Sequence, residues 1–403
     1  MLKNQLITPE GTKDYLFEEA AARRIVEKTL RTQFENRGFF EVVTPALEFL
    51  DVFSVRGRGI PIENMQKLVD PKGRLMVLRP DSTLPIARLC ATRLKGRPLP
   101  LRLYYNQPVY TVTRDASGRS DEVAQAGAEL IGDSSSKTDL ELVTMALCAM
   151  QSCGLSNFRL ELGHIGVFNG LMDEWKLDEE LREELRLLIE SKNYPALNDR
   201  LDREAPSGAA EVLKQLPRLF GGEEVFEKAE ELLCGNQAAQ ALAYLHTVYQ
   251  NLQELGFGEQ VTVDLGLVNR TDYYTGIIFK GYIEGHGGEV LSGGRYDRLL
   301  AQFGEDTGAI GFAVNVDAVA QAVLQGGEPL LIPPAVLVHI QPGSEVEGIR
   351  HLSRLSGEGV CTELSLLDCA EDSLQYAEQK QITQMDVVAA DGIHTLFVGR
   401  ETE

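Results

Sequence analysis

The sequence lacks any run of about 18 apolar residues, the length that a helix needs to cross a lipid bilayer. Its first residues, MLKNQLITPEGTKD, contain no apolar core of the kind found in secretory signals. We therefore expect a cytoplasmic protein with no membrane partner. The 403 residues, of which 43% are hydrophobic, are enough for two or three domains with a sizeable core.

Cysteine is scarce, and its arrangement excludes the usual metal frameworks. No two of the six cysteines form a Cys-x-x-Cys pair, and no His/Cys cluster has metal-ligand spacing. The phosphate-binding glycine motifs Gly-x-x-x-x-Gly-Lys-Ser/Thr and strand-linked Gly-x-Gly-x-x-Gly are absent too. We predict neither a metal nor a cofactor. Most of the cysteines lie in apolar helical patterns, so we interpret them as buried reduced thiols.

Positive charge is also in short supply. The chain has 39 Lys and Arg against 60 Asp and Glu, a formal net charge of −21. This argues only weakly against a nucleic-acid partner, because a basic patch can occur on an acidic protein. The shortage is strongest near the C-terminus: no Lys or Arg occurs from Leu299 to Ile349, and residues 335–403 hold 12 acidic and 4 basic residues. A surface that binds nucleic-acid phosphates needs the opposite balance.

The sequence does contain a succession of helical and extended patterns. A helical stripe occupies residues 17–37, and two strands within 101–131 flank a glycine-containing loop at 115–121. Residues from about 169 to 255 are helical and carry no chemical motif. We predict an α+β protein whose first domain, residues 1–328, contains this helical stretch as an insertion.

A second, smaller domain follows a proline-rich linker. Pro329, Pro333 and Pro334 mark the linker, and strand and helix patterns then alternate over residues 335–400. Such alternation is typical of an α/β unit. We therefore predict a small α/β domain at 335–403.

Two neighbouring segments carry most of the chemical character. Residues 268–279, VNRTDYYTGIIF, place Tyr273 and Tyr274 in tandem between two alternating strand patterns, and residues 292–297 read SGGRYD. Each tyrosine combines an apolar ring with a hydroxyl that requires a partner when it is buried. A packing role at a strand edge is the ordinary interpretation of such a pair, and a binding site is the alternative.

Two further segments place polar side chains at sheltered positions. In RPDST, which leads from a strand pattern into a helix, Asp81, Ser82 or Thr83 is suited to cap the helix N-terminus. Gln125 and Glu129 are four residues apart on a predicted strand, so their side chains point to the same side. Their neighbours are small or apolar, which favours a covered position over a solvent-facing one.

Together these segments resemble the signatures of class II histidyl-tRNA synthetases. The Asp-Tyr-Tyr-Thr and Gly-Gly-Arg-Tyr-Asp parts of that family are intact, and five signatures follow the family's order between about residues 8 and 325. The resemblance implies a class II antiparallel sheet flanked by helices, and a homodimer formed through the first signature at 38–53. It also implies a histidine-binding site. The expected residues are Asp81, Thr83 and Gln125 for the α-amino group, Glu129 and Tyr274 for the imidazole ring, and Tyr273 and Tyr296 beside them.

The sequence departs from the synthetases where cations are needed. Amino-acid activation builds negative charge on the α-phosphate of ATP, and class II enzymes stabilise that charge with arginines. At three such positions this chain has Thr111, Asn269 and Ala318. Arg114 and Arg270 are near the first two, but an odd shift along a strand turns a side chain to the opposite face. We expect no aminoacylation and no catalytic residues.

An amino-acid pocket without ATP cations is typical of the synthetase paralogues that serve as regulatory subunits of ATP phosphoribosyltransferase, in the first step of histidine biosynthesis. The segment TPEGTKD, with Glu10 where synthetases usually carry arginine, and the segment QAGAELIG resemble that family. The resemblance implies a short-form catalytic subunit as partner in a hetero-oligomer, L-histidine as the feedback effector, and no tRNA. A divergent histidyl-tRNA synthetase, or a scaffold that uses the fold only for assembly, are the alternatives.

Overall fold

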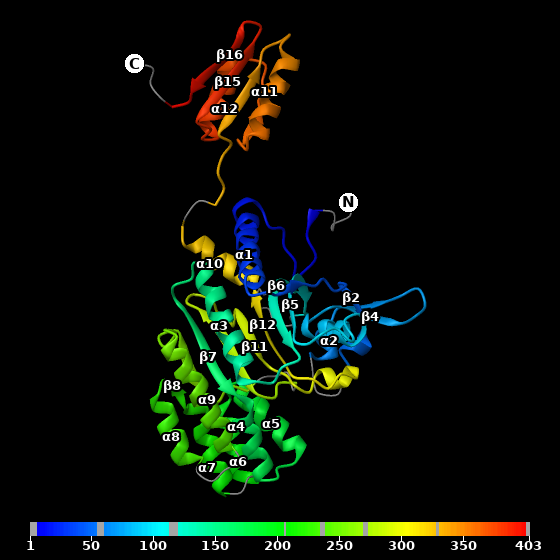
Figure 1. The fold of residues 1–403 in the computed structure, drawn as a ribbon, viewed down its shortest axis with the longest axis vertical. Coiled ribbons are helices and arrows are strands. Elements are labelled where there is room, and N and C mark those ends of the chain that lie inside the picture. Colours follow the sequence, from blue (N-terminus) through cyan, green and yellow to red (C-terminus); the bar gives the residue numbers. More distant parts are fainter. Residues whose placement is uncertain are drawn as a thin grey trace. The chain divides into compact units, whose positions relative to one another are not determined.

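The computed structural model describes residues 6–54, 60–112, 120–204, 207–233, 238–268, 273–327 and 330–399. The chain forms two compact units, Met1–Gly327 and Glu328–Glu403 (Figure 1). Within the described part of the chain, no helix is long and apolar enough to cross a membrane.

A nine-stranded sheet forms the centre of the first unit. Its strands are β1 (Phe40–Glu41), β5 (Leu101–Tyr110), β6 (Glu122–Ile131), β7 (Phe158–His164), β8 (Phe220–Gly221), β9 (Val261–Asp264), β10 (Ile277–Ile283), β11 (Leu291–Arg295) and β12 (Ala309–Asn315). Their order is β1-β5-β6-β12-β11-β10-β7-β9-β8. Neighbours are antiparallel except for the β1–β5 and β7–β9 pairs. The long β5–β6 hairpin was predicted; most of its loop lies outside the described residues.

Three helices pack against this sheet and against one another: α1 (Phe17–Glu35), α3 (Ser136–Ser152) and α10 (Val316–Gln325). On α1, side chains at helical spacing form the buried face, namely Ala22, Val26, Leu30 and Phe34. The opposite face of α1 is charged, with ion pairs such as Arg31–Glu35 on its surface. Because apolar residues at helical spacing are buried and charged residues face outward, the helix was predictable from sequence.

A second, three-stranded sheet precedes the helix that matters most for the site. It comprises β2 (Leu47–Phe49), β3 (Lys67–Val69) and β4 (Leu75–Leu78) in the order β2-β4-β3. The helix α2 (Thr83–Thr92) follows, and its apolar residues share one core cluster with Leu103 and Tyr105 of β5. That packing places the first turn of α2 over the β5–β6 hairpin.

Between β7 and β9 lies the helical insertion, coloured green in Figure 1. Its helices are α4 (Ile165–Glu174), α5 (Glu179–Glu190), α6 (Tyr194–Glu204), α7 (Ser207–Gln215), α8 (Glu224–Leu232) and α9 (Ala238–Glu254). In α5, Leu181, Leu185 and Ile189 form the buried stripe, and Glu179, Glu180 and Glu184 lie on the exposed face. The last helix, α9, packs on α3, α4 and the strands β7 and β9, which fixes the insertion to the sheet.

The second unit has the strand–helix alternation that the sequence predicts. Its elements are β13 (Val336–Ile340), α11 (Glu345–Gly357), β14 (Thr362–Leu364), α12 (Ala370–Gln379), β15 (Gln384–Ala389) and β16 (Gly392–Phe397). The sheet order is β14-β13-β15-β16, with β16 antiparallel to the other three. Apolar clusters on both faces join the sheet to α11 and α12.

One expectation about cysteine is wrong. The five described cysteines are free thiols, but only Cys90 among them is fully buried, and Cys361 is exposed. Cys361 directly precedes β14, a short strand at the edge of its sheet. The sixth cysteine, Cys234, lies outside the described residues.

Candidate functional site

The centre of the site is a buried carboxylate on the strand β6. Glu129 is 1% exposed, and its Oε1 accepts a hydrogen bond of 2.8 Å from the hydroxyl of Thr83. Its Oε2 accepts a short hydrogen bond from the hydroxyl of Tyr296. Gly311, its partner on β12, makes room for this carboxylate, because a Cβ there would overlap it. The hydroxyl groups of Thr83 and Tyr296 therefore hold the buried carboxyl group of Glu129 in one orientation.

The residues Asp81 and Thr83 come to this carboxylate from the start of α2. Asp81 Oδ1 accepts the backbone N–H of Leu84 at 2.9 Å, so the predicted capping role is confirmed for Asp81. Thr83 turns its hydroxyl to Glu129, which the resemblance assigns to the imidazole side of the ligand. Both side chains are partly exposed, whereas Glu129 below them is buried.

Gln125 lies two residues before Gly127, on the same face of β6 as Glu129. Tyr105 of β5 pairs with Gly127, and its hydroxyl fills the space that a Cβ at Gly127 would occupy. That hydroxyl donates a 3.1 Å hydrogen bond to Gln125 Oε1. Tyr105, 1% exposed, is thus a site residue that the sequence reasoning missed. A hairpin centred on the middle of the predicted loop, residue 118, would pair Tyr105 with Ile131, so the position of the loop alone does not give the observed pairing with Gly127.

Three tyrosines complete the wall of the site. The rings of Tyr273 and Tyr274 are 4.8 Å apart between centroids, and Tyr273 meets Tyr296 edge to face at 5.7 Å. Tyr274 lies against Gly294 of β11. Tyr296 is buried, while Tyr273 and Tyr274 are half-buried. The seven residues expected at the site are therefore brought together, with a buried floor and a partly exposed rim.

Burial dominates the electrostatics of this cluster. It raises the pKa of Glu129 to about 8, the nearby charge of Asp81 adds to the rise, and the hydroxyls of Tyr296 and Thr83 oppose it. Burial also raises the pKa of Asp81 to about 6, against the lowering effect of backbone N–H groups. No Lys or Arg is paired with Glu129 among the residues that the structure describes. Such a site is suited to a ligand that brings its own positive charge.

The positions where synthetases hold ATP contain no cation in the described structure. Thr111 bonds through its backbone to Asp121, and Ala318 is 5% exposed at the start of α10. Beside Ala318, Arg23 of α1 lies 3.3 Å from Asp317 and is therefore already neutralised. Asn269 and the alternatives Arg114 and Arg270 lie outside the described residues.

Two buried arginines, Arg79 and Arg295, bond to oxygen atoms of the protein itself. Arg79 donates to the backbone oxygens of Pro108, at 2.7 Å, and Thr44, at 2.6 Å. Arg295 pairs with Asp139 at 2.6 Å and Asp297 at 3.0 Å. Neither guanidinium is available to a phosphate group. Within the described chain, no group of three or more His, Cys, Asp or Glu residues is arranged to hold a metal ion.

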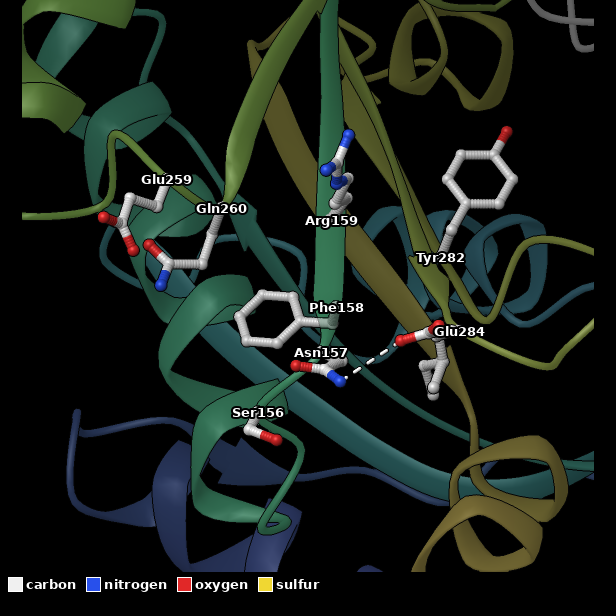
Figure 2. A pocket seen from close by; sticks show the side chains of 9 residues that line it. Ser156, Asn157, Phe158, Arg159, Glu259, Gln260, Tyr282 and Glu284 are labelled. Carbon is white, nitrogen blue, oxygen red and sulfur yellow. Dashed lines mark hydrogen bonds between the residues drawn. The ribbon is translucent and has the colours of Figure 1, made fainter.

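A surface pocket of about 600 Å³ lies elsewhere, where β7 and β9 begin and β10 ends (Figure 2). A 3.1 Å hydrogen bond from Asn157 to Glu284 joins the residues that flank β7 and β10. None of the seven expected residues lines this pocket. It is therefore separate from the Glu129 site.

Comparisons with known proteins agree with this geometry. The family model for histidyl-tRNA synthetase matches residues 11–319. A protein of Clostridium kluyveri named ATP phosphoribosyltransferase regulatory subunit is 41% identical over 93% of this chain and 97% of its own length. A protein of Clostridium acetobutylicum with the same name is 39% identical over 96% of both chains. The chain belongs to this family of regulatory subunits.

Solved structures place the fold of these regulatory subunits among the class II synthetases. The crystal structure of an ATP phosphoribosyltransferase regulatory subunit/histidyl-tRNA synthetase from Bacillus halodurans matches 96% of this chain and 99% of its own, with a TM-score of 0.85 and 29% identity. Histidyl-tRNA synthetase from Nostoc sp. shares the fold, with a TM-score of 0.79 over 98% of this chain and 97% of its own, at 19% identity. The predicted fold class is confirmed, and so is the predicted family.

Family membership agrees with the loss of catalytic groups. The regulatory subunits are by name not catalysts, and in this member the described ATP positions hold Thr111 and Ala318 in place of arginine. The residues expected for the amino-acid ligand nevertheless lie together, from Glu129 to the tyrosines. The arginines that are replaced at Thr111 and Ala318 are the groups that synthetase chemistry requires.

Proposed function

We propose that this chain is the regulatory subunit of an ATP phosphoribosyltransferase and that it binds L-histidine as the feedback effector. In this proposal Glu129 and Tyr274 hold the imidazole ring, with Tyr273 and Tyr296 beside it, and Asp81, Thr83 and Gln125 hold the α-amino group. A short-form catalytic subunit in the cytoplasm is the partner, and tRNA is not. Inhibition follows if histidine binds one state of the assembly more tightly than another.

One observation carries the proposal: a buried carboxylate, oriented by two hydroxyls, faces a half-exposed rim and has no cationic partner among the described residues. Burial without a counter-charge raises the pKa of this carboxyl group, and a cationic ligand would favour its ionised form. Histidine carries an ammonium group and a ring that is easily protonated, so it fits both Asp81 and Glu129.

A homodimer is part of the proposal, and exposed apolar side chains support it. Phe40 of β1 is 74% exposed, and Val43, which follows β1, is 75% exposed. Phe49 of β2 and Val69 of β3 add further exposed apolar surface on the small sheet. Residues 38–53, which include β1 and β2, resemble the first class II signature, so we propose that a second copy of the chain covers this segment. The domains at 1–328 and 335–403 remain part of the same proposal.

Reconstitution tests the proposal directly. The chain is mixed with a short-form catalytic subunit, the complex is isolated by gel filtration, and phosphoribosyl transfer is measured with and without histidine. We expect the two proteins to co-elute, and we expect histidine to inhibit the complex. Glu129→Ala should keep the assembly and remove the inhibition, because the variant alters the site and leaves the surface unchanged.

Two results would contradict the proposal in different ways. If the isolated chain gives no heat of binding with millimolar histidine, the sensor role fails. If Glu129→Ala leaves inhibition unchanged although histidine binds the wild-type chain, the chain acts as a scaffold and the effector acts elsewhere.

A further inference from the structure

A buried amide lies beneath the candidate ligand site. Gln107 of β5 is 5% exposed. Its Nε2 donates to Thr44 Oγ1 at 3.0 Å and to Ser82 Oγ at 3.2 Å, and its Oε1 accepts the backbone N–H of Thr44 at 3.1 Å. One side chain therefore joins three parts of the sequence: the segment between β1 and β2, the start of α2, and β5.

The partners of this amide are themselves fixed. Ser82 is completely buried and lies between Asp81 and Thr83, the two site residues of α2. Thr44 is 3% exposed, and its carbonyl oxygen accepts a 2.6 Å hydrogen bond from Arg79. Gln107 also pairs directly with Gln125 across the β5–β6 hairpin. The three residues proposed for the α-amino group are therefore all close to Gln107. Asp81 and Thr83 are the chain neighbours of Ser82, which Gln107 contacts, and Gln125 is the cross-strand partner of Gln107 itself.

We propose that Gln107 is a positioning residue: by holding Ser82 against Thr44, it fixes Asp81 and Thr83 at the distance from Gln125 that the α-amino group of the ligand requires. This inference rests on the proposed function and deepens it. An amide suits the task because it offers two donors and an acceptor in one plane. A fully satisfied buried network keeps one geometry, whereas an apolar side chain at 107 leaves the Thr44 N–H unpaired and removes the amide donor from Ser82 Oγ.

The test separates positioning from mere stability by comparing two ligands. Gln107→Met keeps the volume of the side chain and removes its hydrogen bonds. Calorimetric titration measures binding of L-histidine and of 3-(imidazol-4-yl)propionate, which lacks the α-amino group. We expect affinity for histidine to fall about tenfold, the effect of one misplaced charged hydrogen bond, and affinity for the analogue to stay within about twofold.

A second variant at the same contact and a control variant far from it in sequence show whether the loss of affinity is specific to this contact. Ser82→Ala removes the other end of the contact with a smaller change in volume, and it should show the same selective loss. Ser373→Ala is the matched control: Ser373 is completely buried in the second unit and bonds to His339 at 2.9 Å and to Ser365 at 2.7 Å. The control should lower thermal stability and leave both affinities unchanged.

The inference is overturned if Gln107→Met and Ser82→Ala bind both ligands as the wild type does, or weaken both equally. If the wild-type chain binds no histidine, the proposed function fails, and amide hydrogen exchange then decides the positioning role alone. In that case Gln107→Met should exchange faster than the wild type in the first turn of α2, where Leu84 bonds to Asp81. Unchanged exchange there would remove the inference.

Discussion

Glu129 is the residue on which the site depends. Its carboxylate is buried, its two oxygens accept from Thr83 and Tyr296, and a cationic ligand would be its compensating charge. We expect Glu129→Gln to weaken histidine binding by about 10- to 100-fold, because a hydrogen bond to a charged group contributes about 1.5–3 kcal/mol. The free protein should be at least as stable as the wild type, since the variant no longer buries an ionisable group. Calorimetric titration and thermal unfolding measure the two quantities.

A matched control is available on α3. Glu141 forms a 2.5 Å ion pair with Arg102 of β5, and neither residue is among those expected at the site. Glu141→Gln should bind histidine as the wild type does. The assignment of Glu129 is wrong if both variants bind within twofold of the wild type.

The raised pKa of Glu129 predicts how stability depends on pH. The carboxyl group has a pKa of about 8 in the folded protein and 4.5 without the fold. Unfolding therefore releases a proton between these values, so the free energy of unfolding decreases as the pH rises from about 4.5 to 8. Glu129→Gln should lack this component, and its stability advantage over the wild type should grow across the same range.

Urea unfolding at pH 5, 6, 7 and 8 measures that difference. The only tryptophan of the chain, Trp175 at the end of α4, reports on the first unit by its fluorescence. Parallel curves for the wild type and Glu129→Gln over this range would show that the carboxyl group is not protonated in the folded protein.

The motifs that survive in sequence order predicted residues that the structure brings together, Asp81, Glu129 and Tyr296 among them, but they did not predict the contacts. That Thr83 turns to Glu129 depends on a contact across 46 positions of sequence, which no local pattern encodes. Tyr105 was missed because a tyrosine in a strand is ordinarily interpreted as a core residue. Tyr105 does belong to the core cluster, in addition to its contact with Gln125.

At the scale of elements, the strand β11 is held in place by a buried ion pair. Arg295 at its end donates to Asp139 of α3, and Tyr244 of α9 donates to the same carboxylate. The hydroxyl of Tyr296, the next residue, reaches Glu129. This network joins the sheet, α3 and the helical insertion directly behind the site.

Removing the arginine tests how much the arrangement depends on that pair. Arg295→Met leaves Asp139 buried without its cation, so we expect a loss of about 3–5 kcal/mol in the free energy of unfolding. Arg295→Lys should recover only part of the loss, because a point charge cannot reproduce a planar fork of donors. Urea unfolding followed by Trp175 fluorescence gives the values. Arg298→Met, at an exposed neighbour, is the control and should cost less than about 0.5 kcal/mol. A loss below 1 kcal/mol for Arg295→Met would contradict this account.

The elements themselves were predicted best where one face is buried. The stripe on α1 follows directly from the helical period, and the structure has it. The hairpin of β5 and β6 was predicted too, but β6 does not alternate, because Ala126 to Ile131 are all buried. Sheet order was beyond such reasoning. The parallel pairing of β1 with β5, which brings Thr44 to Gln107, joins segments about 60 residues apart through backbone groups that every residue carries. The first-turn position of α2 likewise depends on tertiary packing.

For the whole molecule, the chain has the fold of the synthetases without the arginines that their reaction requires. The described arginines Arg79, Arg295 and Arg23 are all engaged with carbonyl or carboxylate oxygens of the fold. Charge that builds on the α-phosphate of ATP would meet Thr111 and Ala318. Loss of one such donor costs about 3–4 kcal/mol of transition-state stabilisation, and the losses at several positions combine.

We therefore expect no histidine-dependent exchange of pyrophosphate with ATP, even at enzyme concentrations at which histidine binding is saturated. Ala318→Arg alone should not restore the exchange, because the cation at Thr111 is still absent and Asp317 lies beside the new side chain. Exchange is measured with labelled pyrophosphate, and an active histidyl-tRNA synthetase serves as the positive control. Exchange above background that requires histidine would establish the divergent synthetase instead, since a regulatory subunit has no use for an activated amino acid. Histidine binding without exchange separates recognition of the amino acid from its activation, which is the division that the positions of Glu129 and Ala318 predict.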